Sequence, residues 1–370
     1  MPDKKLFVDG HALEDMAQGV SRYIAGLCCA YAGLFPDTTI HVGLRAPQGL
    51  PDLLARHKNI CAVPYPSRHH LRNLNWFIPR YLRSQGIGAA VLQYMRPLRH
   101  TAKYIVVVHD LLFLEYPQLF PWLYRTTRAR YFTWSARHAD TVVAVSDTAR
   151  LSVAQHTGLD PKAIPIVPNG ISSMYFHQAG STDDRDHLLR TYGITRYILC
   201  VSRWEPRKNQ AILLKAYAAL RLWRQAVHLV FIGSPTLPCP RYQQIYGQLP
   251  GIARQHVHSL RNVDQAALLR FYRNAAVCVY PSMAEGFGRP PLEAAAAGTP
   301  VLCSEVKPMS DWDFLLPGFF PPANADMLAG KLQACLEKPP DSYGLRAMSR
   351  RVKQEFDWAR SACLLQEVVR

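Results

Sequence analysis

Short apolar runs alternate with longer stretches of helical apolar spacing along most of the 370-residue chain. Alternation of this kind predicts parallel sheets covered by helices, that is, an α/β fold. Ligands of such sheets bind beyond the carboxyl ends of the strands, so polar residues that directly follow a run are candidate site residues. The strand-like runs are residues 5–8, 40–44, 89–92, 104–108, 141–145, 197–202, 229–232 and 277–280.

The chain is longer than the roughly 100 to 200 residues that one hydrophobic core usually serves, so two domains are expected. We expect an N-terminal domain over residues 1–177 and a C-terminal domain over residues 191–352. Between them, residues 178–190 predict a linker, because their first half is polar, mixed in charge and without apolar periodicity. Residues 353–370 predict a last helix.

The stretch 277–301 predicts a strand, a loop and an Ala-rich helix that begins with two prolines. Gly286 and Gly288 in the loop let the backbone approach a ligand, and amides at a helix N-terminus suit a diphosphate. Glu285 and Glu293 flank this loop, eight residues apart. Carboxylates accept hydrogen bonds from hydroxyls, so the spacing suits a sugar on one side of a diphosphate and a ribose on the other. The alternative is a pair of solvated charges.

The same stretch contains EGFGRPPLE, two glutamates separated by seven residues. It resembles the signature of the retaining nucleotide-sugar glycosyltransferases of family 4. The resemblance covers nearly the whole chain and is strongest over residues 197–303. It implies a GT-B fold, with two Rossmann-like, doubly wound domains facing across a cleft and a C-terminal helix that crosses back to the N-terminal domain. HDLLFLEYP and EPRKN are closest to bacterial mannosyltransferases of surface polysaccharides.

Two basic residues, Arg203 and Lys208, follow the strand predicted over residues 197–202. Together they could neutralise a diphosphate leaving group, although a charge pair on a loop is more often only solvated. The family has an Arg and a Lys at matching places. The resemblance implies that these two stabilise the departing charge with the Phe287 and Gly288 amides, while Glu285 holds sugar hydroxyls. It likewise implies that Glu293 binds the ribose.

In the first half, His109 and Asp110 directly follow a fully apolar strand-like run. A lone histidine is more often structural, but the family has a similar pair here, and the resemblance implies that His109 lies against the donor sugar. Asp110 would then support that histidine or its loop. Gly19 and Arg22 stand where the family has a glycine-rich loop that faces donor and acceptor phosphates. This chain lacks the double glycine, so Gly19 is equally well the first residue of a helix.

The chain carries 43 Lys and Arg against 27 Asp and Glu, and the excess is uneven. Residues 68–137 hold eleven basic residues against only Asp110 and Glu115. Such a positively charged patch favours binding to an anionic partner, which could be nucleic acid, acidic lipid or a phosphorylated substrate. Segments 69–85 and 121–138 mix arginine with aromatic residues, which is typical of helices on a lipid surface. Alternatively, the aromatics are core and the arginines are solvated.

Nine cysteines are scattered without metal-type spacing, which favours reduced thiols. The chain starts directly with a predicted strand, and its longest uncharged helical run is shorter than the roughly 20 residues that a membrane span needs. We therefore expect a cytoplasmic protein without a signal peptide or a span. It would associate peripherally with the inner face of the cytoplasmic membrane.

Three other classes of protein compete with this interpretation. Asp311-Trp312-Asp313 matches the metal motif of single-Rossmann (GT-A) glycosyltransferases, but short matches of this kind are frequent by chance. A dehydrogenase is disfavoured because no G-x-G-x-x-G motif follows a predicted strand. A basic RNA-binding protein without catalysis would explain the charge, but it leaves the glutamate pair and the phosphate-type loops without a purpose.

The sequence thus predicts a retaining, metal-independent hexosyltransferase with no cofactor beyond its nucleotide-sugar donor. GDP-mannose is the first choice of donor, and UDP-sugars or rhamnosyl donors stay open. The acceptor would be a lipid-linked sugar or a polysaccharide in bacterial surface glycan biosynthesis, that is, O-antigen, capsule or exopolysaccharide. Nucleic acid is not expected as a partner.

Overall fold

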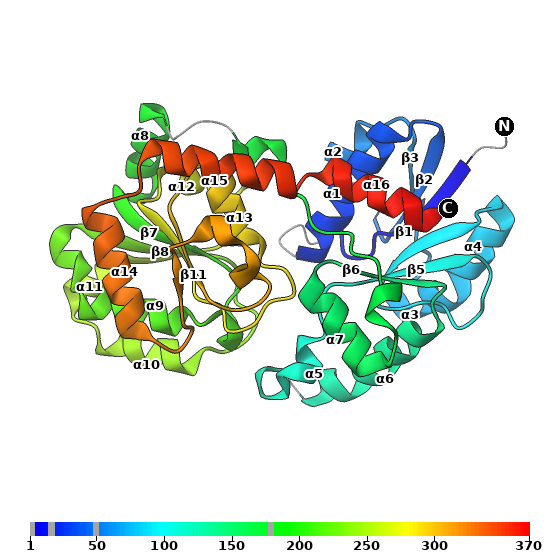
Figure 1. The fold of residues 1–370 in the computed structure, drawn as a ribbon, viewed down its shortest axis with the longest axis horizontal. Coiled ribbons are helices and arrows are strands. Elements are labelled where there is room, and N and C mark those ends of the chain that lie inside the picture. The colour runs from blue at the N-terminus through cyan, green and yellow to red at the C-terminus, as the bar shows by residue number, and fades with distance from the viewer. Residues whose placement is uncertain (1–3, 14–18, 47–51, 121, 177–180) are drawn as a thin grey trace. The chain divides into compact units, whose positions relative to one another are not determined.

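The computed structural model describes residues 4–13, 19–46, 52–120, 122–176 and 181–370. The chain forms two compact units (Figure 1). The N-terminal unit comprises residues 1–170 and 356–370, and the C-terminal unit comprises residues 171–355. Each unit contains a six-stranded sheet in which every pair of neighbouring strands is parallel.

The N-terminal sheet has the strand order β3-β2-β1-β4-β5-β6. Its central strands are almost entirely buried, because helices cover parallel sheets on both faces. Five strands match the predicted runs, whereas β3 was not predicted: it is an edge strand, with Cys61 exposed and Pro64 at its end. The strands are β1 (Lys4–Asp9), β2 (Thr38–Leu44), β3 (Ile60–Pro64), β4 (Ala89–Gln93), β5 (Lys103–Val108) and β6 (Thr141–Ala144).

Helices of very different length connect these strands. One continuous helical stretch changes type along its length, from the α-helix α3 through a single π-helical turn to the α-helix α4. The helices are α1 (Gly19–Leu34), α2 (Asp52–Ala55), α3 (His70–Arg72), the π-helix η2 (Asn73–Phe77), α4 (Ile78–Gln85), α5 (Leu112–Glu115), α6 (Trp122–His138), α7 (Asp147–Thr157) and α16 (Trp358–Val369), with 3₁₀ turns at Pro117–Leu119 and Pro161–Ala163.

The last helix, α16, packs against α1 within the N-terminal unit (Figure 1). Its first residue, Trp358, lies directly on Gly26 and Gly170. A Cβ atom at these glycines would come within 2.2 and 2.5 Å of the indole, so neither position accepts a side chain. The Ser361 hydroxyl donates to the Pro168 carbonyl at 2.8 Å, which fixes the helix further.

The C-terminal sheet has the order β12-β11-β10-β7-β8-β9, and its core lies between the sheet and the helices around it. The strands are β7 (Arg196–Val201), β8 (Val227–Ile232), β9 (Val257–Leu260), β10 (Val277–Tyr280), β11 (Val301–Ser304) and β12 (Phe319–Phe320). The helices are α8 (Thr182–Tyr192), α9 (Gln210–Ala219), α10 (Pro240–Gln248), α11 (Gly251–Gln255), α12 (Gln265–Asn274), α13 (Arg289–Ala296), α14 (Ala325–Glu337) and α15 (Ser342–Glu355), with 3₁₀ turns at Ser173–Phe176, Pro206–Lys208, Leu222–Gln225, Met309–Asp311 and Asp313–Leu315.

The linker expected over residues 178–190 is helical over most of its length. Residues 178–180 lie outside the described residues, and α8 occupies the rest. Ser181 caps this helix by accepting a hydrogen bond from the Asp184 amide at 3.1 Å. Leu188 is the only buried residue of α8. Because its apolar stripe is so narrow, the helix gives no clear apolar periodicity in the sequence.

No helix in the described part of the chain is long and apolar enough to span a membrane. None of the nine cysteines, all of which the structure describes, forms a disulfide, and five of them are at least partly exposed.

Candidate active site

The centre of the C-terminal unit's polar cluster is an ion pair between Lys208 and Glu285. Lys208 ends a 3₁₀ turn in the loop that leaves β7, and Glu285 stands in the loop that leaves β10, the strand next to β7 in the sheet. The Lys208 Nζ atom lies 2.5 Å from Glu285 Oε1, and both side chains are more than nine-tenths buried. Because parallel strands end at the same edge of a sheet, the two loops bring their charged residues together.

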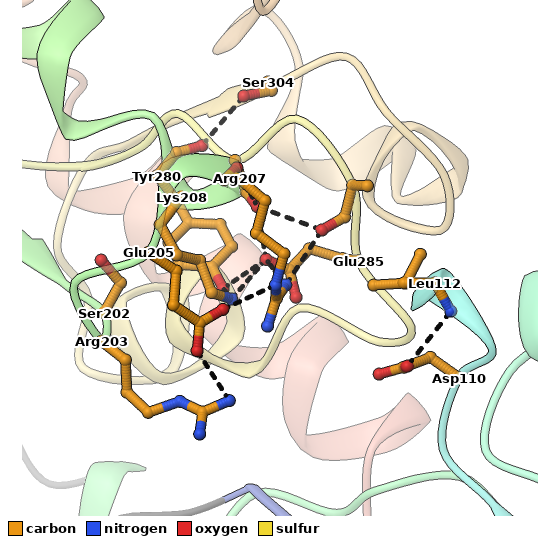
Figure 2. A network of polar contacts seen from close by, with 12 residues as sticks. Asp110, Leu112, Ser202, Arg203, Glu205, Arg207, Lys208, Tyr280, Glu285 and Ser304 are labelled. Carbon is orange, nitrogen blue, oxygen red and sulfur yellow. Dashed lines mark hydrogen bonds and ion pairs between the residues drawn. The ribbon is translucent and has the colours of Figure 1, made fainter. Parts of the chain in front are cut away.

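A single oxygen of Glu285 collects four donors. Besides Lys208, the Tyr280 hydroxyl donates to Oε1 at 2.9 Å and the Ser282 hydroxyl at 2.5 Å. The Arg207 guanidinium donates to it at 3.3 Å. Lys208 also donates to the Tyr280 hydroxyl at 2.7 Å, so the phenol accepts from the lysine and donates to the glutamate. Figure 2 shows Lys208 and Arg207 pointing toward Glu285.

Two residues of this cluster, Glu205 and Arg207, were not among the predicted site residues. Glu205 bridges two arginines: Arg203 lies 3.0 Å from Oε1 and Arg207 lies 2.8 Å from Oε2 (Figure 2). Arg203 remains 41% exposed, whereas Arg207 is only 10% exposed. The signal was present in RWEPRKN (residues 203–209), where Glu205 stands between Arg203 and Lys208, the two basic residues that were predicted.

The surroundings shift the pKa values of the central pair. Burial alone would raise the pKa of Glu285, but the charges of Lys208 and Arg207 outweigh it and lower the value to about 2. Burial, and then the Arg207 charge, lower the pKa of Lys208 to about 8 although Glu285 counteracts them. At neutral pH the carboxylate is therefore ionised and the lysine is mostly an ammonium.

The glycine loop after Glu285 is packed tightly. Gly288 caps α13 with φ of +91°, a conformation that favours glycine, and a Cβ atom there would lie 2.8 Å from Met309. The Phe287 ring is buried and meets Trp312 edge-on, with 5.9 Å between ring centroids. Gly286 is buried as well. The backbone of this loop is thus fixed by its own packing.

Glu293 belongs to a separate cluster on α13. Its Oε1 atom accepts from Arg289 at 3.1 Å and its Oε2 atom accepts from the Tyr272 hydroxyl at 3.0 Å. The side chain is 2% exposed. Of the predicted site residues in this unit, Arg203, Lys208 and Glu285 are therefore joined in one network, and Glu293 has partners of its own.

His109 belongs to the N-terminal unit and follows β5 as predicted. Its Nε2 atom pairs with the Gln93 side-chain oxygen at 2.8 Å, and its ring meets Tyr23 edge-on at 4.9 Å. Burial lowers its pKa to about 3, so the imidazole is neutral. The carboxylate of Asp110 accepts from the Leu112 amide at 3.3 Å and so orders the start of α5.

Gly19 is the exposed first residue of α1, and nothing lies within 4 Å of the place its Cβ would take. Space does not require a glycine there. Asp311 pairs with Lys307, and Asp313 pairs with Arg351 at 3.1 Å. Within the described residues, neither aspartate belongs to a group of three side chains suited to hold a metal ion.

Two sequence families match the chain, one in each half. Residues 17–173 match "Glycosyltransferase Family 4" and residues 189–353 match "Glycosyl transferases group 1". The chain belongs to these glycosyltransferases. The family membership expected from the EGFGRPPLE stretch is thereby confirmed, and it favours a transferase over an RNA-binding protein.

Curated relatives of this glycosyltransferase match over parts of their length. The O-antigen chain mannosyltransferase RfbU of Salmonella typhimurium is 27% identical over 54% of this chain and 52% of its own length. A D-inositol 3-phosphate glycosyltransferase of Jonesia denitrificans is 26% identical over 76% of this chain and 68% of its own length. The serotype-specific mannosyltransferase WbdA of Escherichia coli is 23% identical over 62% of this chain and 28% of its own length. The chain thus spans about half the length of RfbU and less of WbdA.

Solved structures confirm the two-domain GT-B fold. Sucrose-phosphate synthase from Thermosynechococcus elongatus has a TM-score of 0.75 at 21% identity, covering 99% of this chain and 98% of the other. Anabaena HepE in complex with UDP and glucose has a TM-score of 0.74 at 18% identity, with 99% of both chains covered. At such identities the likeness concerns the fold alone.

Proposed function

We propose that this glycosyltransferase moves a hexose from a nucleotide sugar to a glycan acceptor with retention of the anomeric configuration and without a metal. The observation that carries the proposal is the set of three cations, Arg203, Arg207 and Lys208, held by the buried carboxylates of Glu205 and Glu285 where two neighbouring strands end. Cations that are held in place before the reaction stabilise charge that develops on a leaving group.

The chemistry needs no enzymic nucleophile. The bond from the sugar's anomeric carbon to the diphosphate breaks while the acceptor oxygen bonds to the same carbon from the same face. The departing diphosphate oxygen takes the acceptor's proton. Lys208, as an ammonium, and half-exposed Arg203 would offset the charge that grows on the diphosphate, with the Phe287 and Gly288 amides contributing.

The glutamates have distinct roles in this proposal. Glu285 fixes Lys208 and Arg207, and it accepts hydrogen bonds from hydroxyls of the donor sugar. Glu293 accepts from the ribose hydroxyls. Arg289 and Tyr272 hold the Glu293 carboxylate in place, with hydrogen bonds of 3.1 and 3.0 Å to its two oxygens. His109, neutral at physiological pH, would contact the donor sugar, and Gly19 would lie near donor or acceptor phosphates.

GDP-mannose is the proposed donor and a surface glycan the proposed pathway. The names of RfbU and WbdA, both mannosyltransferases and the former acting on O-antigen chains, support this choice. A UDP-sugar is the alternative that a solved structure favours, because HepE is described with UDP-glucose. A rhamnosyl donor is the third option.

The acceptor is proposed to be lipid-linked, with the enzyme docked on the anionic inner face of the cytoplasmic membrane. An exposed basic face in the N-terminal unit supports this. Trp76 is 58% exposed between Arg80 and Arg99, whose guanidinium carbons lie 5.7 and 5.8 Å from its ring centroid. Trp122 is 66% exposed on α6. Phe77 and Trp134 are only partly exposed, so half of the interleaved aromatics pack inward.

A nucleotide panel tests the donor. Thermal shifts with GDP, UDP and dTDP should be largest for the base of the true donor, and we expect GDP. Transfer from the matching sugar, followed by NMR of the product's anomeric proton, should show retained configuration. Excess EDTA should leave the rate unchanged. Inversion, or activity that only Mn²⁺ or Mg²⁺ restores after EDTA, would contradict the proposal and would make Asp311 and Asp313 candidates again.

A further inference from the structure

The N-terminal unit contains a buried carboxylate of its own, whose neighbours are histidines rather than lysine and arginine. Asp9 ends β1 and its side chain is fully buried. The Nδ1 atom of His11 lies 2.8 Å from Asp9 Oδ2, and the Nε2 atom of His70 lies 3.0 Å from the same oxygen. The two imidazole rings lie against each other with 3.8 Å between centroids. Two histidines 59 residues apart in the sequence thus converge on one carboxylate oxygen.

From this geometry we propose that Asp9, His11 and His70 bind a divalent transition-metal ion, for which Zn²⁺ is the probe. Two imidazole nitrogens and one carboxylate oxygen form a ligand set that Zn²⁺ takes in sites with an open fourth position. All three ligand atoms lie within 4.8 Å of one another. The ion would take the place of the N–H protons that otherwise point at Oδ2.

The two nitrogen-to-oxygen distances fit such a site with little movement. In a tetrahedral zinc site with bonds of about 2.0 to 2.1 Å, neighbouring ligand atoms are roughly 3.3 Å apart. The nitrogens here lie 2.8 and 3.0 Å from Oδ2, so each would move outward by less than about 0.5 Å. Rotation of the two imidazoles, which are 26% and 20% exposed, supplies this without moving the sheet.

The other carboxylate oxygen has the partners that outer-shell groups of metal sites provide. Asp9 Oδ1 accepts from the Tyr65 hydroxyl at 2.7 Å and from the His11 amide at 3.2 Å. These bonds orient the carboxylate and direct Oδ2 toward the histidines. The Tyr65 hydroxyl is itself packed directly against Gly43. A Cβ atom at Gly43 would lie only 2.3 Å from this hydroxyl. The ligand that is most deeply buried is thus also the most firmly held.

A cavity reaches one of the three proposed ligands. His70 lines a cavity of about 340 Å³ together with His69 and Arg128. A bound ion would tie the end of β1 to the start of α3, two segments that the sheet does not connect. This site is distinct from the residues proposed to stabilise the leaving group, and it does not depend on the proposed function.

Calorimetry with Zn²⁺ alone tests the site, using the full chain without a histidine tag, stripped by chelator and kept reduced. We expect saturable binding that weakens at least 100-fold in His70→Ala, His11→Ala and the isosteric Asp9→Asn. Tyr65→Phe, which removes only an outer-shell bond, should weaken it roughly 10- to 100-fold. Two matched controls should bind as the native chain does: His69→Ala beside the site, and His258→Gln in the pair that His258 forms with His228 at 2.9 Å.

Co²⁺ provides the second readout, because the exposed thiols of Cys61 and Cys363 could also bind the ion. Ligation by nitrogen and oxygen gives visible bands without a thiolate charge-transfer band, and these bands should disappear in His70→Ala. A thiolate band, no binding, or equal affinity in native chain and His70→Ala would overturn the proposal and leave a purely hydrogen-bonded cluster. Transfer activity and nucleotide binding are separate measurements, so failure here would not touch the donor assignment.

Discussion

Each unit has a buried carboxylate just after or at the end of an inner strand of its sheet, Glu285 in one and Asp9 in the other, and the two differ in what surrounds them. Glu285, after β10, is held by the side chains of Lys208 and Arg207, which are cations at neutral pH. Asp9, at the end of β1, is held by His11 and His70. Ammonium and guanidinium groups only donate, so the cations of the first cluster can attract an anion but offer no lone pair to a metal ion. Imidazoles offer lone pairs, so the second cluster can.

The strongest test of this contrast removes the charge of Glu285. Glu285→Gln leaves buried Lys208 and Arg207 without their shared partner, and an uncompensated buried charge costs about 3 to 5 kcal/mol. In a unit of this size that corresponds to a melting temperature lowered by roughly 6 to 20 °C. Differential scanning calorimetry measures it.

The matched control is Asp313→Asn, which breaks an ion pair with Arg351 whose side chains are 70% and 45% exposed. Exposed pairs of this kind contribute little to stability, so the melting temperature should hardly change. If Glu285→Gln shifted it no more than Asp313→Asn does, Glu285 would not be the anchor of the cluster.

The second prediction concerns the rate of transfer. If Arg203 and Lys208 stabilise the departing diphosphate, replacing either by Ala should cost about 2 to 4 kcal/mol in the transition state, as loss of an oxyanion-hole donor does. Turnover should then fall by roughly two to three decades. A steady-state assay with the donor identified by the nucleotide panel decides. A tenfold or smaller decrease for both variants would refute their assignment.

The third prediction uses the low pKa of Lys208, about 8. The ammonium form is needed, and it is the protonated form that is lost as pH rises, so kcat/KM should fall about tenfold per pH unit above pH 8. Lys208→Arg keeps the charge at all these pH values and should remove the alkaline limb, even if its rate is lower. A limb that is unchanged in Lys208→Arg would belong to another group.

The sequence predicted those parts of the candidate site that lie within short contiguous motifs. EGFG, and the basic residues after residue 202, are contiguous signals, and the structure finds Arg203, Lys208 and Glu285 in one network. The bond from Arg207 to Glu285 spans 78 residues and depends on two strands being neighbours, which composition does not disclose. The contact between Asp9 and His70 could not be predicted for the same reason, because it joins residues that are far apart in the sequence.

Short strands were missed on physical grounds as well. β9 is four residues long and only its first residue is buried, so VHSL lacks the apolar run that marks an inner strand. β12 has two residues at the edge of its sheet. Asp311 and Asp313, whose metal-like motif was discounted as a chance match, each pair with a basic side chain.

The last prediction, with the smallest expected effect, is that exposed arginines of the N-terminal unit bind anionic membranes. Arg72, Arg80 and Arg83 lie exposed on or beside α4, in contrast to buried Arg207. Near an anionic bilayer each such charge contributes about 1 kcal/mol, and aromatic side chains inserted at the lipid surface, such as Trp76, add apolar burial.

The protein should therefore sediment with vesicles that contain anionic lipid and not with neutral ones. Salt at roughly 0.5 M should release it, because screening then acts within a few ångströms. Reversal of the three arginines to Glu should abolish sedimentation and leave hydrolysis of the donor unchanged. Sedimentation that ignores lipid charge and salt would mean that these arginines are a solvated face, and the acceptor would then be sought among soluble glycans.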